Sequence, residues 1–228
     1  MKLSSLSILI PAYKDEKTIV NVVERAVLAG RRYADRYEIV ILNDASPDSL
    51  LSVVKKLKRE IPTLRIITHK KNLGYGQTIK ELYCAGMNKW LFTIPGDFQI
   101  DPMEIKKLLS STRQADMIIG WRKNRYDTNT RIRQSRLYNG LLRLLFRLQL
   151  HDVNSVRLMR KSIMDRCTIR SSSAFVDAEL TIRAVRDGCR VVEIPISHRP
   201  RETRGAGGGK LKTIMPVIRD MILYYFHL

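Results

Sequence analysis

The chain has 228 residues, 44% of them hydrophobic and 28% charged, which is typical of one globular domain that buries its own core. Its three cysteines, Cys84, Cys167 and Cys189, are too few and too widely spaced for a disulfide framework or a zinc site. The net charge of +19 favours anionic partners, among them nucleic acid, phospholipid and phosphorylated substrates.

The first residues carry one Lys and a short apolar run without a small-residue cleavage site, so we interpret residues 1–13 as leading into a strand and not as a signal peptide. No stretch reaches the roughly 18 uninterrupted apolar residues that a transmembrane helix needs. We therefore expect a cytoplasmic protein that touches the inner face of a membrane without spanning it.

Short apolar runs alternate with helical patterns over the first 120 residues. The expected strands are residues 7–12, 38–44, 64–68, 90–95 and 116–121, with helices expected at 18–29, 49–59 and 77–85. Near-continuous apolar strands separated by helices predict βαβ units, in which a parallel sheet is covered on both faces. Ligands of such sheets bind beyond the carboxyl ends of the strands.

Polar residues and turn formers follow each of the first four strands, in residues 11–13, 43–48, 69–76 and 95–99. The carboxylates of Asp15, Asp44 and Asp97 belong to three different loops that the fold brings to one edge. They can hold a nucleotide and a divalent cation, or they can form turns and helix caps. The turn and cap interpretation is preferred for Asp48.

The second half is expected to form three helices and one further strand. Leucines at helical spacing, interleaved with arginines, predict an amphipathic helix over 131–150. A helix over 177–187 and a strand over 191–196 follow, and a terminal helix begins near 210 and is interrupted by Pro216. The apolar faces of the two amphipathic helices can pack on the core, bind a partner or lie in a membrane interface.

Four segments of the first half resemble, in order, the motifs of one enzyme family. Residues 11–15 (PAYKD) resemble PxYNE, 43–48 (NDASPD) resemble DDGSxD, 72–76 (NLGYG) resemble NxGxG, and 95–102 (PGDFQIDP) resemble DADxQxxP. In the second half, the patterns GxRxxRxD, DxxSxFKLFR, FDxEL and EVPV followed by R and SK resemble residues 120–127, 152–160, 175–180 and 193–210. The chain thus resembles family 2 glycosyltransferases, in particular the dolichol-phosphate mannosyltransferase-like subgroup that makes polyprenyl-phosphate sugars.

This resemblance implies an α/β fold of the GT-A type, Rossmann-like, with a mainly parallel central sheet flanked by helices in a single domain over residues 1–228. Residues 1–120 would bind the nucleotide sugar and the metal, and residues 121–228 would bind the acceptor. The implied reaction is metal-dependent, inverting transfer of a sugar from a GDP- or UDP-linked donor. A polyprenyl (dolichyl or undecaprenyl) phosphate is the favoured acceptor, with a glycan or another acceptor as the alternative.

The residues implied for the donor lie in the rim loops. Asp97 and Gln99 are the implied ligands of Mg²⁺ or Mn²⁺, and the nucleotide site is implied to consist of Pro11, Tyr13, Asp15, Asn43, Asp44 and Asp97. The chain departs from the family at three places, with Asn43 for an Asp, Lys14-Asp15 for Asn-Glu, and Pro95 for the first Asp of the metal motif. Pro95 removes one usual metal carboxylate; Asp101 could compensate, or it could cap the helix that Pro102 begins.

Arginines are suited to a phosphate acceptor because their forked guanidinium groups bind phosphate oxygens at two points. The segments where the family binds its acceptor phosphate contain Arg122, Arg125, Arg131, Arg201 and Arg204. A phosphate is already ionised at neutral pH, so no strong base is required. Asp152 is the candidate that orients or deprotonates the acceptor, with a salt bridge to a nearby Arg as the structural alternative; Asp152 and Asp97 are the candidate catalytic residues.

Other classes of function explain fewer of these features. Nucleic-acid binding would account for the charge, but no RRM, KH or zinc-finger pattern is present, and we expect no nucleic-acid partner. A nucleotidyltransferase would have a Gly-rich loop directly after the first strand. A non-catalytic relative stays open because of Pro95. Many relatives add transmembrane helices after the catalytic domain, and since none follows here we expect a separate membrane-protein partner.

Overall fold

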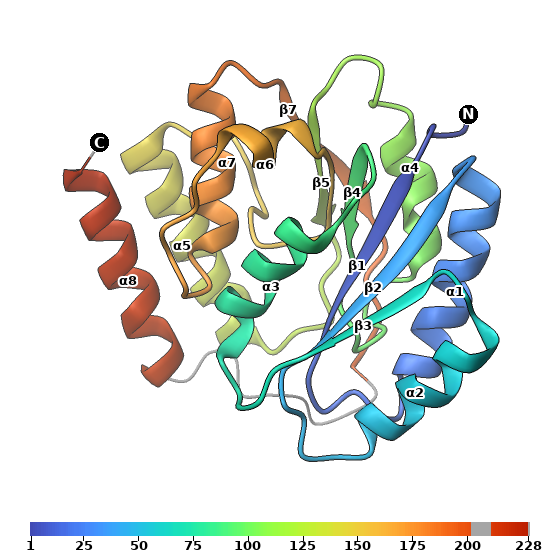
Figure 1. Cartoon of the computed structure of the whole chain (residues 1–228). Coiled ribbons are helices and arrows are strands. Elements are labelled where there is room, and N and C mark those ends of the chain that lie inside the picture. The colour runs from blue at the N-terminus through green and yellow to red at the C-terminus, as the bar shows by residue number, and fades with distance from the viewer. Residues whose placement is uncertain (202–210, 228) are drawn as a thin grey trace.

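A central sheet with helices on both faces forms the computed structural model, which describes residues 1–201 and 211–227 (Figure 1). The strand order is β3-β2-β1-β4-β6-β5-β7. The strands are β1 (Leu6–Ala12), β2 (Tyr37–Asn43), β3 (Leu64–Thr68), β4 (Trp90–Thr93), β5 (Met117–Arg122), β6 (Arg157–Arg160) and β7 (Val191–Ile196). The helices are α1 (Ile19–Tyr33), α2 (Leu50–Glu60), α3 (Gly74–Ala85), η1 (Pro102–Glu104), α4 (Ile105–Leu109), α5 (Asn129–Phe146), α6 (Ser162–Arg166), α7 (Val176–Arg186) and α8 (Leu211–Phe226).

Among these strands β6 alone runs against the others. It is antiparallel to both β4 and β5, whereas β1, β2, β3 and β4 are mutually parallel and β5 is parallel to β7. The carboxyl ends of the six parallel strands therefore meet at one edge, and the chain that enters β6 starts from that same edge. The expected α/β class, with a mainly parallel sheet flanked by helices, is confirmed.

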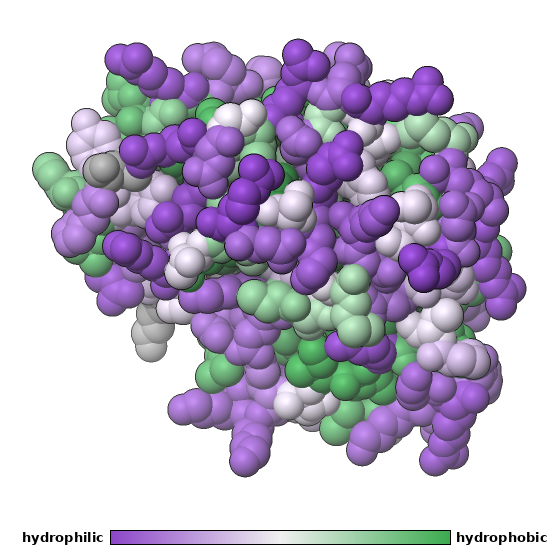
Figure 2. Space-filling view, turned by 45° about the horizontal axis from the view of Figure 1, so that its top comes forward, coloured by the Kyte–Doolittle hydropathy of each residue, from purple (hydrophilic) through white to green (hydrophobic). Residues whose placement is uncertain are grey.

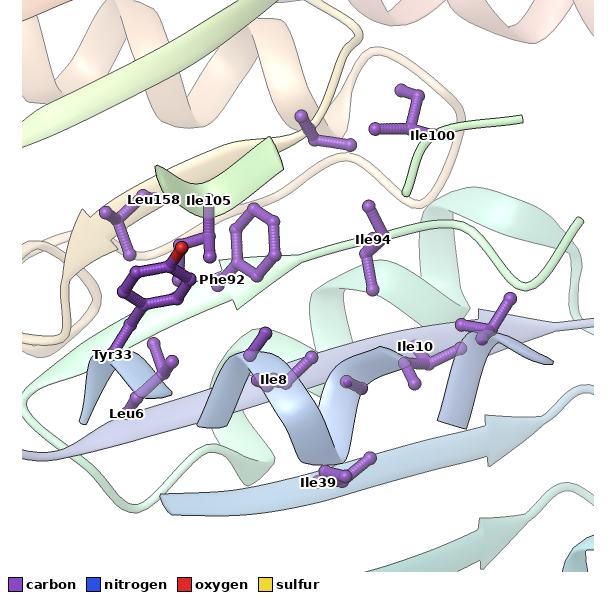
Figure 3. Close-up of a cluster of buried hydrophobic side chains, with 14 of the residues drawn as sticks. Leu6, Ile8, Ile10, Tyr33, Ile39, Phe92, Ile94, Ile100, Ile105 and Leu158 are labelled. Atoms are coloured by element: carbon purple, nitrogen blue, oxygen red, sulfur yellow. The ribbon is translucent and has the colours of Figure 1, made fainter. Parts of the chain in front are cut away.

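Both faces of the sheet are buried, which explains why the strands are nearly continuous apolar runs. In β1, Leu6, Ile8 and Ile10 point to the side covered by α1, α2 and α4 (Figure 3), and Leu9 points to the side covered by α3 and α7. All four side chains are fully buried. Each such side chain contributes about 1.5–3 kcal/mol to folding by leaving water. The alternation therefore fixes which face each strand residue occupies.

The expected elements are present, but three details differ. Helix α5 ends at Phe146, earlier than predicted, because Arg147 has a left-handed backbone (φ 57°) and Leu148 then enters the core. Helix α8 continues through Pro216, where an interruption was predicted. Pro216 lacks an N–H, but it lies in the second turn of α8, where only a few intrahelical hydrogen bonds have formed. The short helix α6 was not predicted.

The outer surface of α5 and α8 is unusually apolar. Helix α8 packs inward through Met221 and through Tyr224, whose ring lies 5.9 Å from that of Phe146 and 5.7 Å from that of Phe175. Its outward side is nevertheless hydrophobic, and the exposed apolar residues of the two helices are Leu137, Leu144, Met215, Ile218, Ile222, Leu223, Tyr225 and Phe226. By contrast, hydrophilic residues dominate the face shown in Figure 2. None of the helices in residues 1–201 and 211–227 has the length and apolar character needed to cross a bilayer.

Candidate donor and acceptor site

A cavity of about 1000 Å³ opens at the edge where the parallel strands end. Its lining comes from the loops after β1, β2 and β4 and from α3, α5 and α8. Most of the predicted site residues line it, namely Pro11, Tyr13, Asp15, Asp44, Asp97, Gln99, Arg122, Arg125, Arg131 and Arg201. Asn43 and Asp152 do not line it, and Arg204 lies outside the described residues.

Three of the rim loops hold a non-glycine residue in a left-handed conformation. These residues are Lys14 (φ 61°), Ala45 (φ 49°) and Phe98 (φ 58°), and each is directly next to a carboxylate that lines the cavity. Such a conformation costs free energy and is found where the surrounding structure holds a functional geometry. The strained loops after β1, β2 and β4 thus coincide with the candidate site.

The carboxyl of Asp15 is buried against the loop that follows β4. Its Oδ2 accepts the N–H of Tyr13 at 3.0 Å, and a Cβ added to Gly96 would lie 2.8 Å from the same oxygen. Burial raises the pKa of Asp15 to about 7, against the lowering effect of the Tyr13 N–H, and the nearby Asp97 adds to the rise. Two acidic groups from different loops therefore lie in one small region of the cavity.

Asp44 holds the first turn of α3. Its carboxylate accepts the N–H groups of Leu73 and Gly74, each at 2.8 Å, which are orphan donors at a helix N-terminus. Gly74 has φ 84°, which a side chain would make costly. Asp44 also lines the cavity. It is therefore a helix cap that belongs to the cavity wall, so the capping interpretation and a place in the candidate site are compatible.

Gly76, the second glycine of the NLGYG segment, lies where a side chain has no room. A Cβ at this position would lie 2.2–2.4 Å from the backbone of Ser172 and Ser173. The absence of a side chain lets α3 pack directly on the loop before α7, so this glycine serves a close approach of two backbones and needs no positive φ.

His69, to which sequence reasoning assigned nothing, joins Asp44 to α3. Its Nδ1 lies 2.7 Å from Asp44 Oδ1 and its Nε2 lies 3.0 Å from Glu81 Oε2. Burial lowers the pKa of His69, but the bonds to the two carboxylates outweigh this and the net shift is upward. With an acceptor on each side, both ring nitrogens can donate only when the imidazole is protonated. The one available signal was its position directly after β3, on the same edge as the three aspartates.

The variant His69→Ala should lose stability in a pH-dependent way. The raised pKa means that the contribution of His69 is fully present below the unfolded value of about 6.5 and is lost as the pH rises through the folded pKa. We expect a loss of roughly 1–2 kcal/mol in the free energy of unfolding at pH 6 and a smaller loss at pH 9. Urea unfolding of both proteins at the two pH values measures this, and an equal loss at both would mean that the ring acts only by packing.

Asp97 and Gln99, the implied metal ligands, are bridged by an arginine. Arg201 Nη2 lies 2.5 Å from Asp97 Oδ2, and its Nε donates to Gln99 Oε1 at 3.3 Å. The described residues contain no group of three or more His, Cys, Asp or Glu placed to hold a metal ion. A guanidinium stands in for a cation between one carboxylate and one amide oxygen, and oxygen donors of this kind suit Mg²⁺ or Mn²⁺. The donor set therefore fits a divalent cation.

The candidate acceptor arginines are held by acidic residues. Arg122 donates to both oxygens of Asp152 (2.7 and 2.8 Å), and Arg125 donates to Asp127 at 2.8 Å. Arg131 lies 3.4 Å from the other oxygen of Asp127. Burial lowers the pKa of Arg131, and the neighbouring arginines lower it further against the effect of Asp127. This arginine cluster keeps unmatched positive charge facing the cavity.

For Asp152 the structural alternative is the one observed. Its side chain is buried and its carboxylate accepts Arg122, while the backbone N–H of Asp152 donates to Glu193 at 2.8 Å. Asp152 lies outside the cavity lining, whereas Arg122 lines it, so the observed salt bridge positions that arginine at the cavity.

Three further side chains of the site loops accept backbone N–H groups that are close in the sequence, namely those of Asp101, Asp48 and Asn43. Asp101 accepts the Met103 N–H at 2.9 Å at the start of η1, which confirms the capping role. Asp48 accepts the Leu50 N–H at 3.2 Å, as expected of a turn former. Asn43 Oδ1 accepts the Ser46 N–H at 3.0 Å, so this buried side chain closes the loop after β2.

Part of the cavity lining is apolar. It includes Leu137 and Leu141 of α5 and Ile214, Val217 and Met221 of α8. One cavity thus presents acidic, basic and apolar groups.

The profile of the family described as Glycosyl transferase family 2 matches residues 7–168. The chain is 28% identical over 227 residues to the dodecaprenyl-phosphate galacturonate synthase of Rhizobium johnstonii, covering 97% of this chain and 66% of that protein. It is 28% identical over 218 residues to the undecaprenyl-phosphate 4-deoxy-4-formamido-L-arabinose transferase of Edwardsiella ictaluri, covering 92% and 64%. The chain spans about two thirds of the length of these relatives.

Among solved structures, the chain is similar to glucosyl-3-phosphoglycerate synthase from Mycobacterium tuberculosis in complex with Mn²⁺, UDP and phosphoglyceric acid. The TM-score is 0.69 at 14% identity, over 96% of this chain and 76% of that one. A complex of the same synthase with Mg²⁺ and UDP gives a TM-score of 0.66 at 13% identity, with the same coverage. These likenesses concern the fold, and they agree with the expected Rossmann-like architecture of the GT-A type.

Proposed function

The chain belongs to glycosyl transferase family 2, and on that premise we propose that it transfers a sugar from a nucleoside-diphosphate sugar to a polyprenyl phosphate. The observation that carries the proposal is the combination of three kinds of lining in one cavity. Acidic groups suit a metal and a nucleoside, arginines suit a phosphate, and apolar side chains suit a hydrocarbon chain. A polyprenyl phosphate joins the last two chemistries in one molecule.

The donor end is formed by the rim loops of residues 1–120. Asp44 offers a fixed carboxylate to the nucleoside, while Pro11 and Tyr13 line the wall beside it. Asp97 and Gln99 would hold Mg²⁺ or Mn²⁺, which when bound neutralises the leaving GDP or UDP. The solved Mycobacterium tuberculosis synthase, whose fold is similar, was crystallised with Mn²⁺ or Mg²⁺ and UDP, and this supports the choice of metal and donor class.

The acceptor end is assigned to the described residues that follow residue 120. Arg122, Arg125 and Arg131 would bind the phosphate, whose oxygen attacks the sugar directly because it is already ionised. Attack from the side opposite the leaving diphosphate inverts the anomeric carbon. Both curated relatives are named as enzymes acting on polyprenyl phosphates, and this supports the choice of acceptor. The apolar region favours a lipid over a glycan.

The exposed apolar residues of α5 and α8 support a peripheral position at the cytoplasmic face of a membrane. Two of them, Leu137 and Ile218, also line the cavity, and the charge of +19 attracts anionic headgroups. A helix lying in the interface would bring the cavity to the level at which a lipid phosphate is found. A separate membrane protein is a further candidate partner at this surface.

A transfer assay with matched arginine variants tests this function. A panel of GDP- and UDP-linked sugars is incubated with undecaprenyl phosphate in detergent, and glycolipid is separated by chromatography. We expect product from one donor, and Arg131→Ala should raise KM for the lipid about 10- to 100-fold, since a bond to a charged group contributes about 1.5–3 kcal/mol. Arg133→Ala, on the same helix but exposed and outside the cavity, is the control. Absence of glycolipid with every donor, or equal KM values for the two variants, would contradict the proposal.

A further inference from the structure

Arg201 occupies the position that the proposed function gives to the metal. Its guanidinium contacts Asp97 Oδ2 and Gln99 Oε1 together, and all three residues line the cavity. The second oxygen of Asp97 is already used, because it accepts the N–H of Gln99 at 3.1 Å. A metal ion that binds these oxygens of Asp97 and Gln99 must therefore compete with the guanidinium of Arg201.

The electrostatics of this region make the two cations mutually exclusive. The Asp97 side chain is 11% exposed and that of Arg201 is 26% exposed, so water screens the pair only partly. Asp15 adds a second acidic group nearby that also interacts with Arg201. A divalent ion placed on the same oxygens would repel the guanidinium strongly over a few ångströms.

We propose that Arg201 is a resident cation of the metal site, which holds Asp97 and Gln99 while no metal is bound and which the metal must displace. This inference rests on the proposed metal-dependent function. Once displaced, the guanidinium remains close to Arg131, with which it already interacts electrostatically. Arg201 therefore has a second possible binding partner, the phosphate of the acceptor, because it lines the same cavity as the other candidate acceptor arginines.

Two consequences follow for binding. The apparent affinity for the metal is reduced by the fraction of molecules in which Arg201 is closed on Asp97, because only the open form is competent. Coupling is reciprocal, so a prenyl phosphate that attracts Arg201 raises metal affinity, and the metal raises affinity for the prenyl phosphate. While metal and prenyl phosphate are both absent, the Arg201 guanidinium neutralises the Asp97 carboxylate.

Mn²⁺ binding to nucleotide-free protein tests the proposal, because bound Mn²⁺ loses the sharp electron paramagnetic resonance signal of the free ion. We expect Arg201→Ala to bind Mn²⁺ about tenfold more tightly than the wild type. The matched control is Arg199→Ala, which removes one positive charge two residues earlier, where Arg199 pairs with Asp101 at 2.7 Å and not with Asp97. The Mn²⁺ affinity of Arg199→Ala should stay within about twofold of that of the wild type. Asp97→Asn should not bind Mn²⁺, which shows that the ion binds at this site.

The outcomes separate the inference from the proposed function. Equal or weaker Mn²⁺ binding by Arg201→Ala, with binding still lost in Asp97→Asn, overturns the resident-cation role and leaves the metal site in place. The same tightening in both arginine variants also overturns it, because it would reflect overall charge. If neither the wild type nor Arg201→Ala binds Mn²⁺ even with GDP or UDP present, the metal-dependent function and the inference both fall.

Discussion

Replacing Asp97 with Asn should abolish the metal-dependent stabilisation of the protein by its nucleotide and lower sugar transfer at least about 100-fold. The reason is that Pro95 stands where the family has a carboxylate, so the proposed metal site has Asp97 as its acidic ligand on the loop after β4. Asn keeps the shape of the side chain but not its charge. The measurement is the melting temperature with GDP or UDP, each with and without Mn²⁺, followed by turnover with the preferred donor.

Asp101→Asn is the matched control for that experiment. Asp101 lies in the same segment, but it caps η1 and pairs with Arg25 and Arg199. Its replacement should lower the melting temperature of the free protein and keep the rise that metal and nucleotide cause together. A metal-dependent rise that survives in Asp97→Asn would place the cation elsewhere in the cavity.

Replacing Asp177 with Ala should lower the free energy of unfolding by about 3–5 kcal/mol, a large part of the stability of a domain of this size. Arg157 is fully buried, and its Nη2 lies 3.1 Å from Asp177 Oδ1. The hydroxyls of Tyr75 and Tyr83 donate to the same carboxylate at 2.7 and 2.6 Å. Removal of the carboxylate leaves a buried guanidinium without its counter-charge and two hydroxyls without their acceptor. Urea unfolding measures the change.

Tyr83→Phe distinguishes the ion pair from the surrounding hydrogen bonds. This variant loses one hydroxyl but keeps both charges, so we expect a loss of only about 1 kcal/mol. If Asp177→Ala were as stable as Tyr83→Phe, the buried pair would contribute nothing beyond its hydrogen bonds. Since Arg157 begins β6 and Asp177 lies in the first turn of α7, the comparison measures how firmly α7 is fixed to the sheet.

Much of the fold could be predicted because its determinants are local. Apolar runs of four to seven residues mark strands that are buried on both faces, and the polar loops that follow them mark the edge where the cavity forms. The carboxylates of Asp15, Asp44 and Asp97 could be placed on one edge by that rule alone. The predicted helix boundaries were less accurate. The end of α5, for example, depends on the backbone conformation of Arg147.

The partners of the site residues could not be predicted, because each pair is made by tertiary structure. Arg201 and Asp97 are 104 residues apart, and His69 and Asp44 are 25 apart, in segments without a shared periodicity. The sequence pattern around a charged loop residue is the same whether its side chain contacts a ligand or another side chain. For Asp152 the structure shows the salt bridge to Arg122, one of the two possibilities that the sequence left open.

The close packing at Gly76 also gives the molecule a mechanical connection between its donor end and its surface. Asp44 grips the start of α3, α3 presses on the backbone of Ser172 and Ser173, and Ser171 Oγ donates to Asp220 of α8 at 2.7 Å. Three consecutive serines thus join α8 by direct contacts to α3 and, through Asp44, to the loop after β2. If α8 lies on a bilayer as proposed, these contacts tie the position of the cavity to that of the anchoring helix.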